Sequence, residues 1–189
     1  ELPAPCRSKS FLLPENAVDL DRFPFWERSR GKGALRVAFV GRVVPYKGAD
    51  LLIEAVAASN LKAVIEVVVV GEGPQRQELE ALVRRLGLER QVRFAGWVPN
   101  QDLVTELSDC QLLCLPSVRE FGGGVVIEGM ALGLVPVVAN YGGPPELIDE
   151  DSGIAVDFSD RTSLIRGISA AIERLACDDD LLTQMSRNA

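Results

Sequence analysis

The sequence predicts an α/β domain built on a doubly wound parallel sheet of about six strands. Short apolar runs alternate with segments of helical periodicity along most of the chain. The runs are continuous, with no alternation of apolar and polar residues, as is typical of strands buried on both faces of a parallel sheet. Glycine, proline or asparagine follows each of the first five runs, and these residues mark turns.

The strands and helices are expected to alternate once the domain begins. Strands are expected at 37–40, 64–70, 92–95, 112–115, 136–139 and 154–156. Helices are expected at 50–59, 74–86, 100–108, 125–134, 145–148 and 162–176. In the second of these helices, four apolar side chains recur at the spacing of one helix face: Leu79, Leu82, Val83 and Leu86. Asn100 is expected to cap the third.

Residues 1–33 are rich in proline, serine and charge, and they have only weak periodicity. We interpret them as a leading segment and linker, with a brief extended stretch at 11–14, and residues 34–189 as the folded domain. The chain begins at Glu1 without a methionine and ends at Ala189 within a helical pattern. We therefore expect a domain excised from a longer protein.

The composition excludes several function classes. The absence of histidine removes Ser-His-Asp and Cys-His catalysis and most zinc sites. A net charge of −7 with no basic stripe argues against nucleic-acid binding. No apolar run approaches the roughly 20 residues of a membrane-spanning helix. Cys110 and Cys114 are expected on a buried strand as small apolar residues, and free thiols without a signal peptide favour the cytoplasm.

The arrangement of the sheet predicts where a ligand binds. In open parallel sheets, ligands bind beyond the carboxyl ends of the strands. Five loops rich in glycine and proline follow the predicted strands, and we expect them to line one crevice: 41–48, 71–74, 96–100, 116–124 and 140–145.

The first of these loops carries two cations, Arg42 and Lys47. A guanidinium that donates two hydrogen bonds and an ammonium that acts as a point charge together suit a diphosphate. The alternative is a pair of solvated surface cations. The loop is not a P-loop, because no Gly-Lys-Ser/Thr precedes a helix here.

Residues 119–128 contain three consecutive glycines before a helix. Such a start leaves backbone N–H groups open to an approaching phosphate. Glu120 and Glu128 flank the glycines, and a carboxylate beside an anion site is suited to accepting sugar or ribose hydroxyls. The alternatives are a helix-dipole carboxylate for Glu128, and for Glu120 an ion pair with Arg119 or a free acid.

The remaining loops are less specific. Gly71-Glu72-Gly73-Pro74 forms a tight strand-to-helix turn, but the third glycine of a dinucleotide-binding fingerprint is missing. The segment 96–99 either packs against a base or only turns the chain. The segment 140–146 either contacts a ligand or forms a plain turn into a helix.

Taken together, these motifs resemble the carboxyl-terminal domain of the group 1 retaining glycosyltransferases of the GT-B fold. The resemblance covers residues 11–176, and the matching pieces stand in the family's order: 13–19, 41–48, 71–74, 94–98, 116–117, 120–128 and 142–146. Glu120 and Glu128 have seven residues between them, as in the family. One departure is that Phe121 and Gly122 exchange the family's usual order. The resemblance implies a Rossmann-like domain that forms one half of a GT-B fold.

The resemblance also implies the roles of the site residues. The domain would bind a nucleotide-diphosphate sugar, linked to UDP or GDP, with no metal and no further cofactor. Arg42 and Lys47 would hold the diphosphate, Glu120 the sugar hydroxyls and Glu128 the ribose hydroxyls. The rest of the donor site would comprise residues that meet the phosphate or the base: Gly73, Val98, Gly123, Gly124 and Val125.

The family pairs this domain with an amino-terminal, acceptor-binding domain that is absent from this chain. The full-length protein is expected to be a retaining hexosyltransferase that can contact a membrane, whereas the isolated chain is expected to transfer little or no sugar. Two alternatives stay open: another GT-B enzyme, such as a nucleotide-sugar epimerase or a phosphorylase, and a non-catalytic nucleotide-binding module.

Overall fold

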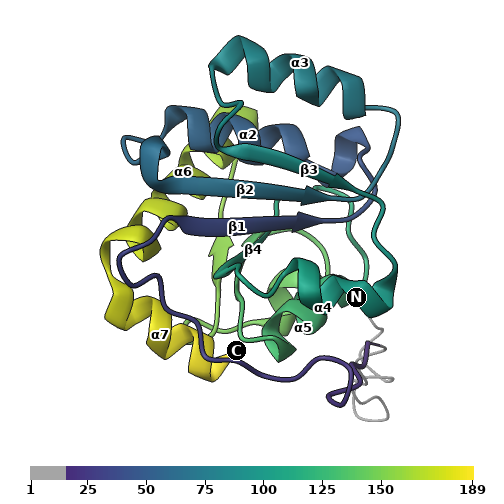
Figure 1. Ribbon diagram of the computed structural model, residues 1–189, viewed down its shortest axis with the longest axis vertical. Helices are drawn as coiled ribbons and strands as arrows, with labels where there is room; N and C mark the ends of the chain where they lie inside the picture. Colours follow the sequence, from purple (N-terminus) through teal and green to yellow (C-terminus); the bar gives the residue numbers. More distant parts are fainter. Residues whose placement is uncertain (1–15) are drawn as a thin grey trace, which may run out of the picture.

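The computed structural model describes residues 16–189, which form a six-stranded, fully parallel sheet between two layers of helices (Figure 1). The strand order is β3-β2-β1-β4-β5-β6. The strands are β1 (Leu35–Val40), β2 (Ile65–Val70), β3 (Val92–Gly96), β4 (Leu112–Leu115), β5 (Val135–Ala139) and β6 (Ile154–Val156). This confirms the predicted doubly wound α/β fold.

The α-helices cover both faces of the sheet. One face packs against α2 (Ala49–Ala58), α3 (Arg76–Leu86) and α6 (Arg161–Cys177), and α7 (Asp179–Asn188) adds to the same core. The other face packs against α4 (Leu103–Glu106) and α5 (Gly124–Ala131). Four short 3₁₀ turns complete the described elements: η1 (Pro45–Lys47), η2 (Lys62–Val64), η3 (Asn100–Asp102) and η4 (Pro144–Leu147).

The alternation of side chains along β1 divides the core into these two layers. Val37 and Phe39 belong to the cluster with α2, α3 and α6, whereas Ala38 belongs to the cluster with α4 and α5. All three are fully buried. Successive side chains of a strand point to opposite faces, so a continuous apolar run is what a strand covered on both sides requires.

Three expectations from the sequence need correction in detail. The helix expected at 125–134 ends at Ala131, because the chain turns at Gly133, whose φ is +79°. The helix expected at 145–148 is the 3₁₀ turn η4. The helical segment from Asn100 begins as η3, and the Asn100 side chain caps nothing, because its amide is bonded elsewhere. The extended stretch expected at 11–14 lies outside the described residues.

The cysteines behave as buried apolar groups where they lie in the core. Cys114 is on β4, whereas Cys110 precedes that strand instead of lying on it. Burial raises the pKa of the Cys110 thiol to about 12 and also raises that of Cys114. Both thiols therefore stay protonated at neutral pH. Cys177 is exposed, and Cys6 lies outside the described residues.

The linker before β1 runs from the α4–α5 side of the sheet past α7 to the start of β1 (Figure 1). Arg28 anchors it: its backbone N–H donates to Ser186 Oγ at 2.8 Å, and its Nε donates to the Leu132 carbonyl at 2.9 Å. Burial lowers the pKa of this guanidinium. Among the helices of residues 16–189, none has the length and apolar character needed to cross a bilayer.

Candidate functional site

The strand order reverses between β1 and β4, and loops from both strands meet at their carboxyl ends. Backbone hydrogen bonds tie the loops after β1, β2 and β3 together: Gly41 N–H donates to the Val70 carbonyl at 2.9 Å, and Gly71 N–H donates to the Gly96 carbonyl at 2.7 Å. Such a reversal is where open α/β sheets bind ligands.

A cavity of about 510 Å³ opens at this point. Eight of the nine site residues expected from the sequence line it: Arg42, Lys47, Val98, Glu120, Gly123, Gly124, Val125 and Glu128. Arg42 is solvent-exposed at the rim, and Glu128 is half-buried. The tertiary structure therefore gathers residues from the loops after β1, β3 and β4 around one space.

Gly73, the ninth, does not line the cavity. A Cβ at this position would lie 2.2 Å from the Val43 carbonyl oxygen. The Val43 N–H also donates to the Glu72 carbonyl at 3.0 Å. The lack of a side chain at Gly73 lets the loops after β1 and β2 pack backbone to backbone, which holds the Arg42 loop in place.

Lys47 and Glu120 form an ion pair within the cavity wall. Lys47 ends η1, and Glu120 lies in the loop after β4. The two side chains are only 19% and 15% exposed, so the pair is partly shielded from water. This geometry replaces the alternative in which Glu120 pairs with its neighbour Arg119. A ligand with a diphosphate must compete with Glu120 for the ammonium.

Helix α5 points its first turn at the cavity without a side-chain cap. Its N-cap, Gly123, has φ of +65°, a left-handed conformation that glycine adopts at little cost. Gly123 has no side chain with which to bond the first N–H groups of the helix, and the helix dipole places partial positive charge there. This end of α5 can therefore accept an anion.

The loop 140–145 packs against the backbone of the Glu120 loop. A Cβ at Gly142 would lie 2.1 Å from the Glu120 carbonyl oxygen, and a Cβ at Gly143 would lie 1.9 Å from that of Phe121. Gly143 N–H donates to the Glu120 carbonyl at 3.3 Å. Neither glycine lines the cavity. The two glycines thus allow the close backbone approach that places Glu120.

Three polar or aromatic side chains of the loops expected at the crevice line the cavity, although none of them was assigned to the donor site from the sequence. Asn100 was expected at the crevice and as a helix cap; it lines the cavity, but its Nδ2 donates to Glu128 Oε1 at 3.3 Å instead of capping a helix. Glu72 also lines the cavity and is paired with Arg76 at 2.9 Å. Trp97 lines it as well, and it is 72% exposed. Their position directly after β2 and β3 was the available signal.

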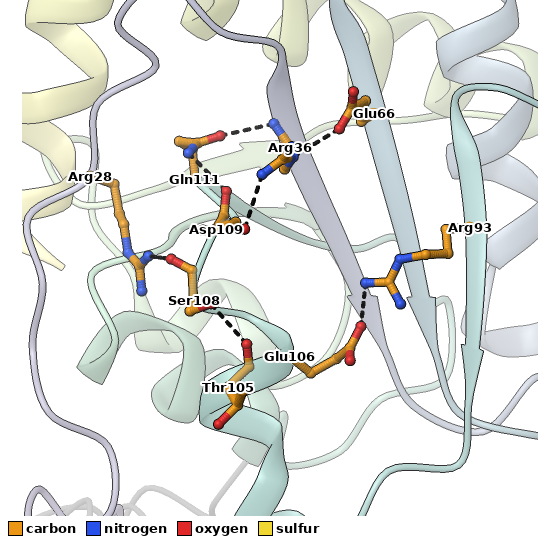
Figure 2. A network of polar contacts seen from close by, with 9 residues as sticks. All are labelled: Arg28, Arg36, Glu66, Arg93, Thr105, Glu106, Ser108, Asp109 and Gln111. Carbon is orange, nitrogen blue, oxygen red and sulfur yellow. Dashed lines mark hydrogen bonds and ion pairs between the residues drawn. The ribbon is translucent and has the colours of Figure 1, made fainter.

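A second hollow, of about 440 Å³, lies at the opposite edge of the sheet, around the amino ends of β1, β2 and β3. Figure 2 shows the ion pairs in its wall: Arg36 pairs with Glu66 at 2.8 Å and with Asp109 at 3.1 Å, and Arg93 pairs with Glu106. Because these groups are mutually neutralised, this hollow is a weaker candidate for an anionic ligand.

Comparison with known proteins identifies the family. The sequence model of the group 1 glycosyl transferases matches residues 24–189. The chain belongs to this family. It is 35% identical to the D-inositol 3-phosphate glycosyltransferase of Corynebacterium kroppenstedtii over 163 residues, which are 81% of this chain and 35% of that protein.

Solved structures agree in fold with this group 1 domain. The carboxyl-terminal domain of a group 1 glycosyl transferase from Francisella tularensis matches with a TM-score of 0.76 and 25% identity, over 91% of this chain and 94% of that one. An Anabaena protein crystallised with UDP-glucose matches with a TM-score of 0.71 and 26% identity, over 82% of this chain and 42% of that one. The chain spans less than half the length of the curated relatives that it matches here.

Proposed function

We propose that this chain is the nucleotide-sugar-binding domain of a retaining glycosyltransferase, with a UDP- or GDP-linked sugar as its substrate. The observation that carries the proposal is the convergence of Arg42, Lys47 and the uncapped start of α5 on one cavity. Two cations and a helix N-terminus suit a diphosphate. Glu120 and Glu128, in the same cavity, suit the hydroxyls of a sugar and a ribose.

The Lys47–Glu120 ion pair implies an order in which the two parts of the substrate bind. An incoming diphosphate takes Lys47 from Glu120, and the released carboxylate then accepts hydroxyls of the sugar. Glycosyl transfer builds negative charge on the departing nucleotide. Arg42, Lys47 and the first amides of α5 stabilise that charge in place, so this mechanism uses no metal ion.

A second, acceptor-binding domain completes the enzyme in this proposal. Support comes from the length of the relatives, of which this chain covers less than half. Support for the substrate class comes from the Anabaena structure with UDP-glucose. The isolated chain is accordingly expected to bind nucleotide and to transfer little or no sugar.

Isothermal titration of the chain with UDP, GDP and ADP, with and without magnesium, tests the proposal. We expect one nucleotide to bind without metal, and the double variant Arg42→Ala, Lys47→Ala to weaken binding about a hundredfold. Arg90→Ala is the matched control, because it removes an exposed cation from the opposite edge of the sheet.

Binding of none of the three nucleotides at millimolar concentration would contradict the proposed site. So would equal affinity of the double variant and the wild type. Sugar transfer by the 189-residue chain alone would contradict the requirement for a second domain.

A further inference from the structure

Asn100 links an arginine of the linker to a carboxylate of the cavity. Its Oδ1 accepts a hydrogen bond from Arg22 Nη2, and its Nδ2 donates to Glu128 Oε1 at 3.3 Å. Asn100 and Glu128 line the cavity, whereas Arg22 does not. The three side chains come from three separate segments, the linker, η3 and α5.

The chemistry of the three side chains permits one arrangement of the amide. A guanidinium can only donate hydrogen bonds, and a carboxylate can only accept them. The asparagine amide has one end of each kind, so its oxygen faces Arg22 and its nitrogen faces Glu128. The reversed amide would set donor against donor and acceptor against acceptor. Arg22 and Glu128 therefore favour the same orientation of the amide, and Arg22 holds its oxygen end in place.

A turn of the linker holds Arg22 in place. The backbone N–H groups of Arg22 and Phe23 donate to the Asp19 carbonyl at 3.1 and 3.0 Å. The Phe23 ring is buried in the same apolar cluster as Leu103 and Leu107, at the α4 side of the sheet. The Arg22 guanidinium lies over that ring, 5.8 Å from its centre. The group that orients Asn100 is thus docked on the domain by a buried anchor.

We propose that Asn100, oriented by Arg22, positions the Glu128 carboxylate to accept the ribose hydroxyls of the nucleotide. The inference rests on the proposed function and assigns two positioning residues to it. A carboxylate already held in one orientation loses less rotational freedom when it binds two hydroxyls. The linker thereby contributes to nucleotide affinity, although Arg22 stands outside the cavity.

Titration with paired nucleotides tests the inference on the 189-residue chain. UDP and GDP are each compared with their 2′,3′-dideoxy counterparts, which lack the hydroxyls that Glu128 would bind. Asn100→Asp is nearly isosteric and still accepts from Arg22, but it sets a second carboxylate against Glu128. Gln101→Glu is the matched control, because it adds the same charge at the next residue, outside the cavity.

Two variants of the linker arginine test the role of Arg22 independently of any change at Asn100. Arg22→Leu removes the hydrogen-bond donor, and Arg22→Lys keeps a charged donor at that position. Thermal unfolding of every variant separates a loss of fold from a loss of binding.

We expect Asn100→Asp to weaken binding of both nucleotides, because the added charge opposes their diphosphate, and to weaken binding of the ribonucleotide about threefold to tenfold more than that of the dideoxynucleotide. Arg22→Leu should produce a smaller loss with the same dependence on the ribose, and Arg22→Lys and Gln101→Glu should behave as the wild type. Equal losses for both nucleotides, or no loss in Asn100→Asp, would overturn the inference. An effect of Asn100→Asp without one of Arg22→Leu would overturn the role of Arg22.

Failure of the proposed function can be distinguished from failure of the inference. It is contradicted if the wild type binds neither UDP nor GDP, and its ribose contact is contradicted if the wild type does not prefer the ribonucleotide. Either result would also contradict the inference, because the inference rests on nucleotide binding and on the ribose contact. Wild-type preference for the ribonucleotide with no effect of Asn100→Asp would contradict the inference alone.

Discussion

Lys47 and Glu120 form an ion pair across the point where the strand order of the sheet reverses, although they stand 73 positions apart in the sequence. Each follows a strand that ends at this edge, β1 for Lys47 and β4 for Glu120. The two groups proposed to hold the phosphate and the sugar therefore neutralise each other in this structure.

Glu120→Gln is expected to tighten binding of UDP about fivefold and to lower sugar transfer by the complete enzyme. The variant frees Lys47 for the diphosphate but removes the carboxylate for the sugar. Glu72→Gln is the control in the titration, because it removes a cavity carboxylate that pairs with Arg76 and not with Lys47. Equal gains in both variants would show that the ion pair does not compete with the nucleotide.

Gly143→Ala is expected to displace the Glu120 loop. The new Cβ would lie 1.9 Å from the Phe121 carbonyl oxygen, and that backbone must move to relieve the contact. We expect a loss of about 1–3 kcal/mol in the free energy of unfolding, together with weaker nucleotide binding. Urea unfolding and titration measure the two effects. Gly33→Ala, whose Cβ would meet nothing closer than 3.6 Å, should show neither.

Phe39→Ala is expected to cost about 3–5 kcal/mol of folding free energy, because the ring is fully buried between the sheet and its helices. Phe121 is 85% exposed, so Phe121→Ala should change the free energy of unfolding by less than about 0.5 kcal/mol. Denaturant unfolding of the two variants compares the same substitution at opposite degrees of burial. Similar losses would contradict the packing described above.

Asp160→Ala is expected to lower Tm at neutral pH, and the loss of Tm is expected to be smaller at acidic pH. Asp160 caps α6: its Oδ1 accepts from the Ser163 backbone N–H at 2.8 Å, and this bond holds the pKa of the carboxyl below its ordinary value. A carboxyl with a lowered pKa in the folded state stabilises the protein above the ordinary pKa, and this stabilisation is lost as the pH falls through the lowered value.

The Tm difference between wild type and Asp160→Ala should therefore shrink as the pH falls through and below the ordinary pKa of an aspartate. Glu150→Ala, at an exposed acid outside the helices, is the control. A Tm difference that stays constant as the pH falls would show that the ionised Asp160 carboxyl caps α6 no better than the protonated one.

The number of strands and the loops that follow them could be predicted from local sequence. Continuous apolar runs and their glycine stops are local signals, since a buried strand needs them wherever it lies in the sheet. The expected loops after β1, β3 and β4 do meet, because parallel strands bring their carboxyl ends to one edge. Boundaries such as the end of α5 were less exact, because a helix ends where its neighbours require a turn.

Which side chains become partners could not be predicted from the sequence, because it depends on how the segments pack. Glu120 has an arginine next to it in the sequence, yet it pairs with Lys47 from another loop. Asn100 was expected to cap a helix, yet its amide donates to Glu128. The glycine at 73 serves backbone packing and not the cavity. These outcomes depend on strand order and on distances between remote segments, and local sequence carries neither.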